Sequence, residues 1–234
     1  MKKIEIENNK IRDVFVLIPL FNEAPVLKGV ITELLNYFEN IIVVNDASTD
    51  DSSDILRSLD VILLEHSLNL GQGAAIRTGF RYIRKFTDAQ AVITFDADGQ
   101  HSAKDAVKFA HGILTGNDMV IFGSRFLGSA IGVSVYKKAL LKLATLVTSI
   151  LTNLALTDTH NGLKAFKRSA LQYFIFEIDG YGFESELIRK VRKYNLSFSE
   201  MPTRVEYTKY SKTKGQKLSN AFIIIENIIK TWRQ

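Results

Sequence analysis

The sequence predicts an α/β fold in which helices flank a mostly parallel central sheet. Short apolar runs alternate with amphipathic helical patterns through the first half of the chain, which is typical of buried parallel strands joined by helical crossovers. Polar residues follow the ends of four of these runs, at the edge where such sheets bind ligands. The 234 residues are 46% hydrophobic and 24% charged, the composition of an ordinary globular protein.

The first half supplies the alternating elements in chain order. A strand is expected over 14–20, where apolar residues are almost uninterrupted, and a helix over 24–38, where they recur every three or four positions. The same patterns predict further strands at 41–45, 61–65, 91–95 and 119–123, and helices at 52–58, 73–86 and 104–114. Right-handed crossovers then make neighbouring strands parallel.

The second half has a less regular pattern. It predicts helices, strand-like segments and a final amphipathic helix, in chain order helix 136–156, strand 162–168, helix 183–194, strand 198–207 and helix 216–233. Because no repeat or Pro/Gly-rich linker separates the two halves, we expect one domain over residues 1–234.

Composition and charge exclude several classes of protein. The chain has no Cys, so neither a disulfide framework nor a thiolate metal site is expected. The N-terminus lacks the apolar core of a signal peptide, and the longest uncharged stretch, 143–157, is shorter than the roughly 20 residues of a spanning helix. The net charge of +5 arises within residues 204–234, which suits an anionic partner such as phospholipid head groups. Without a recognisable binding module, nucleic acid is not expected.

The most informative stretch is residues 91–101. An apolar strand stops at Asp96, Asp98 follows two residues later, and Gly99 lets the backbone turn. Two carboxylates this close repel each other and are costly to desolvate without a cation. Hard oxygen ligands suit Mg²⁺ or Mn²⁺, which usually complete their shell with substrate phosphates. The alternative interpretation is a simple Asx turn.

Three other strands deliver polar residues to the same edge. Asn22 and Glu23 follow the first strand, Asp46 the second and Arg125 the fifth. Asp46 suits a hydrogen bond from a base N–H or a ribose hydroxyl, whereas Asp50 suits capping of the helix at 52–58. A single motif of this kind predicts a turn, and four together predict a binding site.

In order, these motifs resemble family 2 glycosyltransferases of the GT-A (Rossmann-like) fold. The matching segments are PLFNE at 19–23, VVNDASTD at 43–50, FDADGQH at 95–101, GSR at 123–125 and DTHNGLKAF at 158–166. The chain is most similar to the branch with dolichol-phosphate mannose synthase and bacterial polyprenyl-phosphate glycosyltransferases. The resemblance implies a nucleotide-sugar-binding half at 14–125, an acceptor half at 126–215 and an amphipathic C-terminal helix at 216–234.

The resemblance implies a UDP- or GDP-sugar donor and inversion at the anomeric carbon. The positions that match donor-binding residues of the family are Pro19, Leu20, Asn22, Glu23, Asp46, Gly71, Arg77, Asp96, Ala97 and Asp98. Asp98, with Asp96 and Gln100, matches the metal ligands. Mg²⁺ or Mn²⁺ there would neutralise the charge that grows on the departing nucleoside diphosphate.

Asp158 and Arg125 are the candidate catalytic residues. Asp158 would deprotonate an acceptor hydroxyl, orient an acceptor phosphate that is already ionised, or simply cap a turn; all three interpretations stay open at this point. Arg125 would hold a donor or acceptor phosphate, and the alternative is a surface ion pair.

The acceptor side has weaker signals. Lys137, Lys138, Glu184 and Lys212 lie at positions where lipid-phosphate relatives carry charged residues toward the acceptor or its phosphate. The helix at 136–156 combines lysines with a wide apolar surface, which is compatible with an interfacial helix as well as with a core helix. The C-terminal helix has a similar pattern and is expected to lie on an anionic membrane or to dock on a small integral membrane partner.

The sequence therefore predicts a glycosyltransferase, peripheral at the cytoplasmic, inner face of the cell membrane, that acts on a polyprenyl phosphate or lipid-linked glycan. Transfer to a sugar hydroxyl of a growing polysaccharide, with Asp158 as base, is the first alternative. A non-catalytic nucleotide-sugar-binding subunit is the second.

Overall fold

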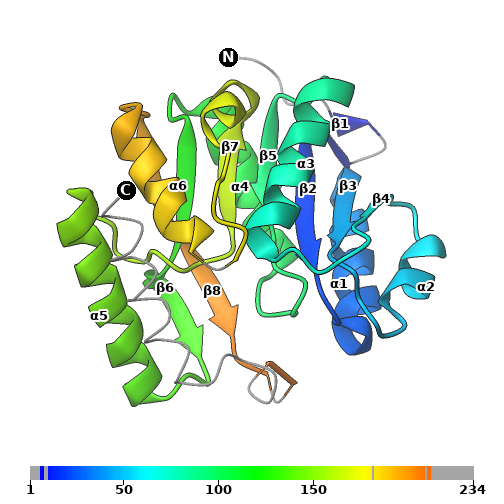
Figure 1. The fold of residues 1–234 in the computed structure, drawn as a ribbon, viewed down its shortest axis with the longest axis horizontal. Helices are drawn as coiled ribbons and strands as arrows, with labels where there is room; N and C mark the ends of the chain where they lie inside the picture. Colours follow the sequence, from blue (N-terminus) through cyan, green and yellow to red (C-terminus); the bar gives the residue numbers. More distant parts are fainter. Residues whose placement is uncertain (1–5, 8–9, 181, 209, 212–234) are drawn as a thin grey trace.

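The computed structural model describes residues 6–7, 10–180, 182–208 and 210–211 (Figure 1). Its strands are β1 (Ile6–Glu7), β2 (Lys10–Leu20), β3 (Phe38–Asn45), β4 (Ile62–Glu65), β5 (Ala91–Thr94), β6 (Val120–Ile131), β7 (Lys164–Lys167) and β8 (Phe198–Glu206). They form one sheet in the order β4-β3-β2-β5-β7-β6-β8, with β1 paired to β2.

Most neighbouring strands are parallel. β2 pairs in parallel with β3 and β5, β3 with β4, and β6 with β8, whereas β7 runs antiparallel between β5 and β6. The predicted α/β fold with a mostly parallel sheet is therefore confirmed. Because β7 is reversed, the loop that precedes it approaches the same edge at which β5 ends.

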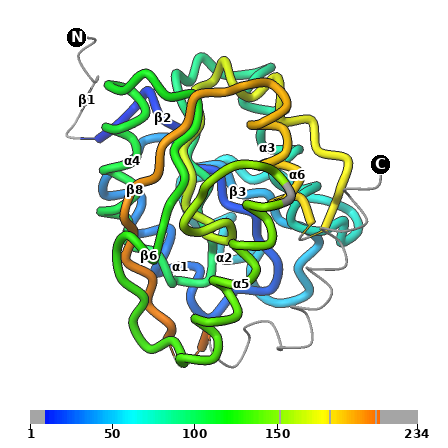
Figure 2. Tube along the Cα trace, turned by 90° about the vertical axis from the view of Figure 1, so that its left-hand side faces the viewer, coloured from blue at the N-terminus to red at the C-terminus, as the bar shows by residue number. Residues whose placement is uncertain are grey.

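Helices cover both faces of the sheet (Figures 1 and 2). One face packs against α1 (Ala24–Leu35), α2 (Ser52–Arg57) and α4 (Ala103–Thr115), and the other against α3 (Gln72–Phe86), the 3₁₀ turn η1 (Arg168–Tyr173) and α6 (Phe183–Lys193). The alternation of β2 explains both layers, since Val14, Val16 and Ile18 face the first and Phe15 and Leu17 the second. The remaining helix, α5 (Val135–Thr152), lies at the side of the molecule.

Some element bounds differ from the sequence prediction. The helix expected over 24–38 ends at Leu35, because the fully buried Phe38 begins β3. The strand expected over 162–168 is limited to β7, since Gly162 and Leu163 form the approach to it. The helix expected over 216–233 lies outside the described residues.

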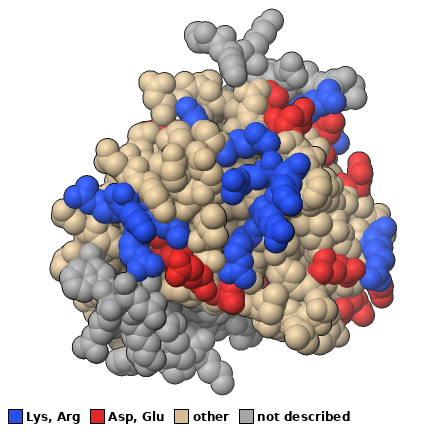
Figure 3. All heavy atoms as spheres, turned by 45° about the horizontal axis from the view of Figure 1, so that its top comes forward, with Lys and Arg blue, Asp and Glu red and all other residues tan. Residues whose placement is uncertain are grey.

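The two ends of the sheet have different surfaces. The carboxyl ends of the parallel strands lie at the lower edge in Figure 1 and carry the predicted polar motifs. On the opposite side, Lys and Arg side chains gather at the surface (Figure 3). No described helix has the length and hydropathy needed to span a bilayer.

Candidate active site

A cavity of about 710 Å³ opens at the carboxyl edge of the sheet. Its walls come from the ends of β2 and β3, the turn after β5, the start of α3, the inner side of α5 and the segment that follows β8. The predicted site residues that line it are Pro19, Leu20, Glu23, Asp46, Gly71, Asp96, Ala97, Asp98, Gln100, Arg125, Lys137 and Glu184. Motifs far apart in the sequence therefore share one cavity.

Asp98 has a poorly compensated negative charge. Burial, followed by repulsion from Asp96 and Glu23, raises its pKa to about 7. The backbone N–H and the side-chain amide of Gln100 both donate to its carboxylate and oppose this increase. A cation that approaches a carboxylate in this environment stabilises its ionised form.

The same turn offers ligands suited to a hard divalent ion. Asp96 and Asp98 provide carboxylate oxygens and Gln100 an amide oxygen, which are the donors that Mg²⁺ and Mn²⁺ prefer. Within the described residues, no three His, Cys, Asp or Glu side chains converge on one metal position. A metal ion bound here would therefore need substrate phosphates or water in its shell.

Asp96 lies tightly against the chain that enters β7. A Cβ atom at Gly162 would overlap its carboxylate, so only glycine leaves Asp96 in its present position. The Gln72 amide donates to Asp96 at 3.4 Å, and the buried His101 lies 3.9 Å from it. The antiparallel β7 thus helps to position the Asp-x-Asp turn.

Asp46 lines the cavity and also holds the loop that leads to α3. Its carboxylate accepts hydrogen bonds from the backbone N–H groups of Leu70 and Gly71 at 2.9 and 2.7 Å. It also contacts His66 Nδ1 at 2.7 Å, and His66 Nε2 contacts Thr78 of α3 at 2.9 Å. This buried network fixes the wall of the cavity that Asp46 and Gly71 form.

Asn22 and Arg77 are not among the residues that line the cavity, and their contact with a donor stays a prediction. Asn22 Oδ1 accepts from the backbone N–H of Thr49 at 2.7 Å, which joins the loops after β2 and β3. Arg77 donates to the carbonyl of Phe176 at 2.8 Å and pairs with Asp179 at 2.7 Å, which anchors the loop before α6. Both side chains hold loops that border the cavity without lining it themselves.

Asp50 acts as the predicted cap. Its Oδ1 accepts from the backbone N–H of Ser52, and its Oδ2 from that of Ala24. One carboxylate therefore satisfies N-terminal N–H groups of both α1 and α2.

Asp158 and Arg125 form a buried ion pair, and Asp158 does not line the cavity. Arg125 Nε donates to Asp158 Oδ2 at 2.6 Å, and the Arg125 backbone N–H donates to the same oxygen at 3.0 Å. Burial alone would raise the pKa of Asp158, but Arg125 outweighs it and holds this pKa below its ordinary value. The geometry therefore does not fit Asp158 as a free general base, because its basicity is low and its carboxylate is occupied.

The Arg125 guanidinium is likewise engaged on every side. Besides Asp158, it donates through one terminal nitrogen to the Tyr207 hydroxyl at 2.6 Å and through the other to the carbonyl of His160. Arg125, which lines the cavity, thus ties β6 to the loop before β7 and to the segment after β8, and its contact with a phosphate stays a prediction.

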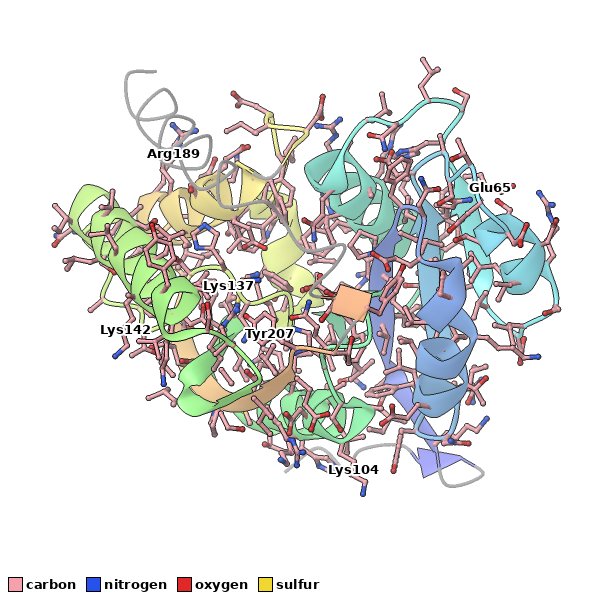
Figure 4. The ribbon with its side chains drawn as sticks, turned by 90° about the horizontal axis from the view of Figure 1, so that it is seen from below. Glu65, Lys104, Lys137, Lys142, Arg189 and Tyr207 are labelled. Atoms are coloured by element: carbon pink, nitrogen blue, oxygen red, sulfur yellow. The ribbon has the colours of Figure 1, made fainter. Side chains whose placement is uncertain are left out.

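Lys137 is the predicted acceptor-side cation that reaches the cavity. Its ammonium group lies 4.6 Å from the centroid of the Tyr207 ring, and Figure 4 shows the two side chains close together at this edge. Burial, followed by repulsion from Arg125, lowers its pKa. Lys138 is exposed and does not line the cavity, and Lys212 lies outside the described residues.

Glu184 forms a buried pair with Lys164 of β7 at 2.8 Å. Burial raises its pKa, and the attraction of Lys164 opposes this. A small space of about 10 Å³ lies beside this pair and Asp96. Glu184 therefore belongs to the deep wall next to the Asp-x-Asp turn.

Sequence reasoning missed Tyr207 and Tyr210. The Tyr210 hydroxyl donates to Glu23 at 2.8 Å, so the segment after β8 crosses to the turn after β2. Tyr207 follows β8 directly, and the rule that polar residues follow strands at the binding edge would have found it. His160 also lines the cavity, and its buried Nε2 has no hydrogen-bond partner in the described structure.

An Asp-x-Asp turn at the carboxyl edge of an α/β sheet, beside a cavity lined by carboxylates, two cationic side chains and apolar residues, is suited to bind a divalent metal together with a phosphorylated ligand. Comparison with known proteins makes this specific. The family model described as glycosyl transferase family 2 matches residues 15–174, and the chain belongs to this family. The protein is a glycosyltransferase of the GT-A fold.

Several relatives match over most of their length. An uncharacterized protein of Methanocaldococcus jannaschii is 33% identical, over 98% of this chain and 97% of its own. A UDP-N-acetylglucosamine–dolichyl-phosphate N-acetylglucosaminyltransferase of Methanococcus voltae is 29% identical, with 92% and 94% covered. A dolichyl-phosphate β-glucosyltransferase of Trichomonas vaginalis is 25% identical, with 92% and 71% covered.

Solved structures share the fold. Glucosyl-3-phosphoglycerate synthase of Mycobacterium tuberculosis, in complex with phosphoglyceric acid, matches with a TM-score of 0.70 at 16% identity, over 93% of this chain and 79% of that one. The same enzyme has been solved with Mn²⁺, UDP and glucosyl-3-phosphoglycerate, and that structure matches with a TM-score of 0.69. At this identity the similarity concerns the fold alone.

Proposed function

We propose that this glycosyltransferase moves a sugar from a UDP- or GDP-sugar to a polyprenyl phosphate or another lipid-linked acceptor, with inversion at the anomeric carbon. The observation that carries the proposal is one cavity in which the Asp96–Asp98 turn faces Lys137 and an apolar wall of α5. The printed activities of the Methanococcus voltae and Trichomonas vaginalis relatives, both on dolichyl phosphate, support the same acceptor class.

The donor nucleotide would occupy the side of the cavity formed by Pro19, Leu20, Asp46 and Gly71. Asp46, held by the loop before α3, presents a fixed carboxylate to a base N–H or a ribose hydroxyl. The diphosphate would then lie near the Asp-x-Asp turn, where two carboxylates require a counter-charge.

The proposed metal is Mg²⁺ or Mn²⁺, held by Asp98 with Asp96 and Gln100. When bound, it supplies Lewis-acid neutralisation of the leaving nucleoside diphosphate. Gln100 keeps the Asp98 carboxylate in place, and Gly162 lets Asp96 approach the same region. Crystallisation of a fold relative with Mn²⁺ and UDP supports this choice of ions.

The acceptor phosphate would lie near Lys137, with its lipid chain along Leu140, Leu141 and Ala144 on the inner side of α5. The second pKa of a phosphate monoester is about 6, so the phosphate is largely ionised at neutral pH. Its oxygen can therefore attack the sugar without a base that removes a proton. The ion pair of Asp158 with Arg125 is therefore compatible with a phosphate acceptor, whereas a sugar hydroxyl would need a free base to remove its proton.

An enzyme that acts on a lipid-linked acceptor works at a membrane. Together with the surplus of Lys and Arg in residues 204–234, this supports a peripheral location at the inner, cytoplasmic face of the cell membrane.

One assay tests the proposal. The protein is incubated with a panel of UDP- and GDP-sugars, Mg²⁺ or Mn²⁺ and undecaprenyl phosphate, and lipid-linked product is followed. Asp98→Ala is expected to lower turnover by about a thousandfold, because the counter-charge for the leaving group is lost. The exposed Asp88→Ala is the matched control and should act like the wild type. Full activity of Asp98→Ala in chelator would refute the metal site, and product with oligosaccharide alone would favour a polysaccharide acceptor.

A further inference from the structure

The burial pattern of α5 is the reverse of that of an ordinary surface helix. Its small polar residues Thr145 and Thr148 are buried, while Leu146 and Ile150 are 56% and 70% exposed. The hydroxyls of Thr148 and Ser149 have no hydrogen-bond partner in the described structure. At a water-facing surface, the hydrophobic effect favours the opposite arrangement.

The exposed apolar residues of α5 form one continuous stripe. Tyr136, Leu143, Leu146 and Ile150 recur at intervals that place them on one side of the helix. Val135 at the start of the helix, and Leu127 and Ile131 of β6, are exposed apolar residues that precede these in the chain. We call the set the α5 face, and its members are Leu127, Ile131, Val135, Tyr136, Leu143, Leu146 and Ile150. A contiguous apolar surface of this kind is typical of a docking site.

The charges within the segment that carries α5 have one sign, and the nearest acid on a paired strand, Glu206 beside Ile131, forms an ion pair with Arg204. Residues 126–157 contain three lysines, at 137, 138 and 142, and no Asp or Glu. Lys138 and Lys142 are exposed. Lys137 instead lies inward, over Tyr207, as Figure 4 shows. An apolar stripe with lysines and without acids matches an anionic lipid surface.

The helix α5 also borders the cavity. Leu140, Leu141 and Ala144 line the cavity from one side of α5, and Leu143 and Leu146 are exposed on the other side. A lipid whose phosphate lies near Lys137 would therefore lie against the same helix that presents the α5 face.

We propose that α5 lies in the surface of an anionic bilayer, with the α5 face among the acyl chains and Lys138 and Lys142 at the head groups. This rests on the proposed function, since it brings the cavity mouth to the membrane from which a lipid acceptor would enter. The helix is then a docking element as well as a wall of the site.

Binding to vesicles tests the proposal. The full chain is sedimented with vesicles of phosphatidylcholine and phosphatidylglycerol, or of phosphatidylcholine alone. The variant Leu143→Gln/Leu146→Gln/Ile150→Gln should weaken binding by about a hundredfold, because three apolar side chains no longer insert. Lys138→Gln and Lys142→Gln should each weaken it by about fivefold and reduce its salt dependence. Phe86→Gln, at a 69% exposed position on α3, is the matched control and should bind like the wild type.

A site-resolved measurement complements the sedimentation. Because the chain has no Cys, Leu146→Cys labelled with an environment-sensitive fluorophore reports this position alone. The emission should shift to the blue on addition of anionic vesicles, and the same label on Phe86→Cys should not respond. Equal binding by the triple-Gln variant, or no shift at position 146, would overturn the proposal. So would an apolar dimer in light scattering that the triple-Gln variant abolishes, since the α5 face would then join two copies.

The assay with a short-chain, water-soluble polyprenyl phosphate separates this inference from the proposed function. The triple-Gln variant should match wild-type turnover on that acceptor and lose at least about tenfold on undecaprenyl phosphate in vesicles. No turnover by either protein on any lipid phosphate would instead refute the proposed function. Turnover on the short acceptor without vesicle binding by the wild type would refute the docking of α5 alone.

Discussion

Asp158 lies in the loop before β7 and Arg125 within β6, and the two form a buried ion pair beside the cavity. The pair fixes this wall of the cavity, because Arg125 also holds Tyr207 and the backbone at His160. Asp158 therefore acts on the site by holding Arg125, which in turn holds Tyr207.

Removal of Asp158 should mainly reduce stability. Asp158→Ala leaves Arg125 buried without its partner, which we expect to lower the free energy of unfolding by about 3 kcal/mol. Arg125→Met/Asp158→Ala should cost less than the sum of the single variants, because neither charge is left unpaired. Urea denaturation measures both quantities. An Asp158→Ala protein of wild-type stability with turnover lost would instead indicate a catalytic base.

His160 should make stability depend on pH. Burial lowers its pKa from 6.5 to about 4, while the attraction of Asp158 opposes this and repulsion from Arg125 and Lys164 adds to it. Between these values the unfolded chain binds a proton that the folded protein does not, so stability falls as pH decreases from 6.5 to 4, by about 3 kcal/mol. His160→Gln should lose this contribution. Parallel urea midpoints of the two proteins across this pH range would contradict the assignment.

Among the elements, the segment after β8 connects parts of the site that the sheet alone keeps apart. Tyr207 contacts Arg125 of β6 and Lys137 of α5, and Tyr210 reaches Glu23 after β2. The acceptor side therefore depends on how this short segment packs against α5.

Tyr207 should position Lys137 for the acceptor. Tyr207→Leu removes the ring under the ammonium group and should raise the KM for polyprenyl phosphate about tenfold, with the donor KM unchanged. Tyr207→Phe keeps the ring and loses only the hydrogen bond with Arg125, so its acceptor KM should change less. Steady-state kinetics with each substrate varied in turn make this comparison. An equal effect of both variants would show that the hydroxyl, not the ring, matters.

For the whole molecule, the cavity is the place where the two halves of the chain meet. β2, β3 and β5 provide one wall, and α5, α6 and the segment after β8 provide the other. A ligand that contacts both walls stabilises the folded chain as a unit, because it binds no such arrangement in the unfolded state.

Nucleoside diphosphate with metal should therefore raise the melting temperature. With ligand at about a hundred times its Kd, the stabilisation is about 3 kcal/mol, which corresponds to an increase of roughly 8 °C for a chain of this size. Thermal melts with UDP and with GDP, each with and without Mn²⁺, also identify the base. Asp98→Ala should lose the metal-dependent part. The same increase in chelator would show that the metal does not take part.

Local patterns in the sequence predicted the alternating elements of the first half and the edge at which Asp46, Asp96 and Asp98 gather. This succeeded because continuous apolar runs define buried strands and because parallel strands end at one edge. The bounds of α1 and β7 were less accurate, since Phe38 and Gly162 act through packing partners distant in the chain.

The fold class and the family could be predicted from the amino-acid sequence, since they depend on patterns within short segments. Packing between distant segments was needed to show that Asp158 is paired with Arg125, that Arg77 and Asn22 brace loops, and that the Lys137 ammonium lies over the Tyr207 ring. It also decided which side of α5 is buried. Apolar residues occur on both sides of α5, so the pattern alone does not show which side is buried. The packing of the neighbouring elements leaves the α5 face exposed.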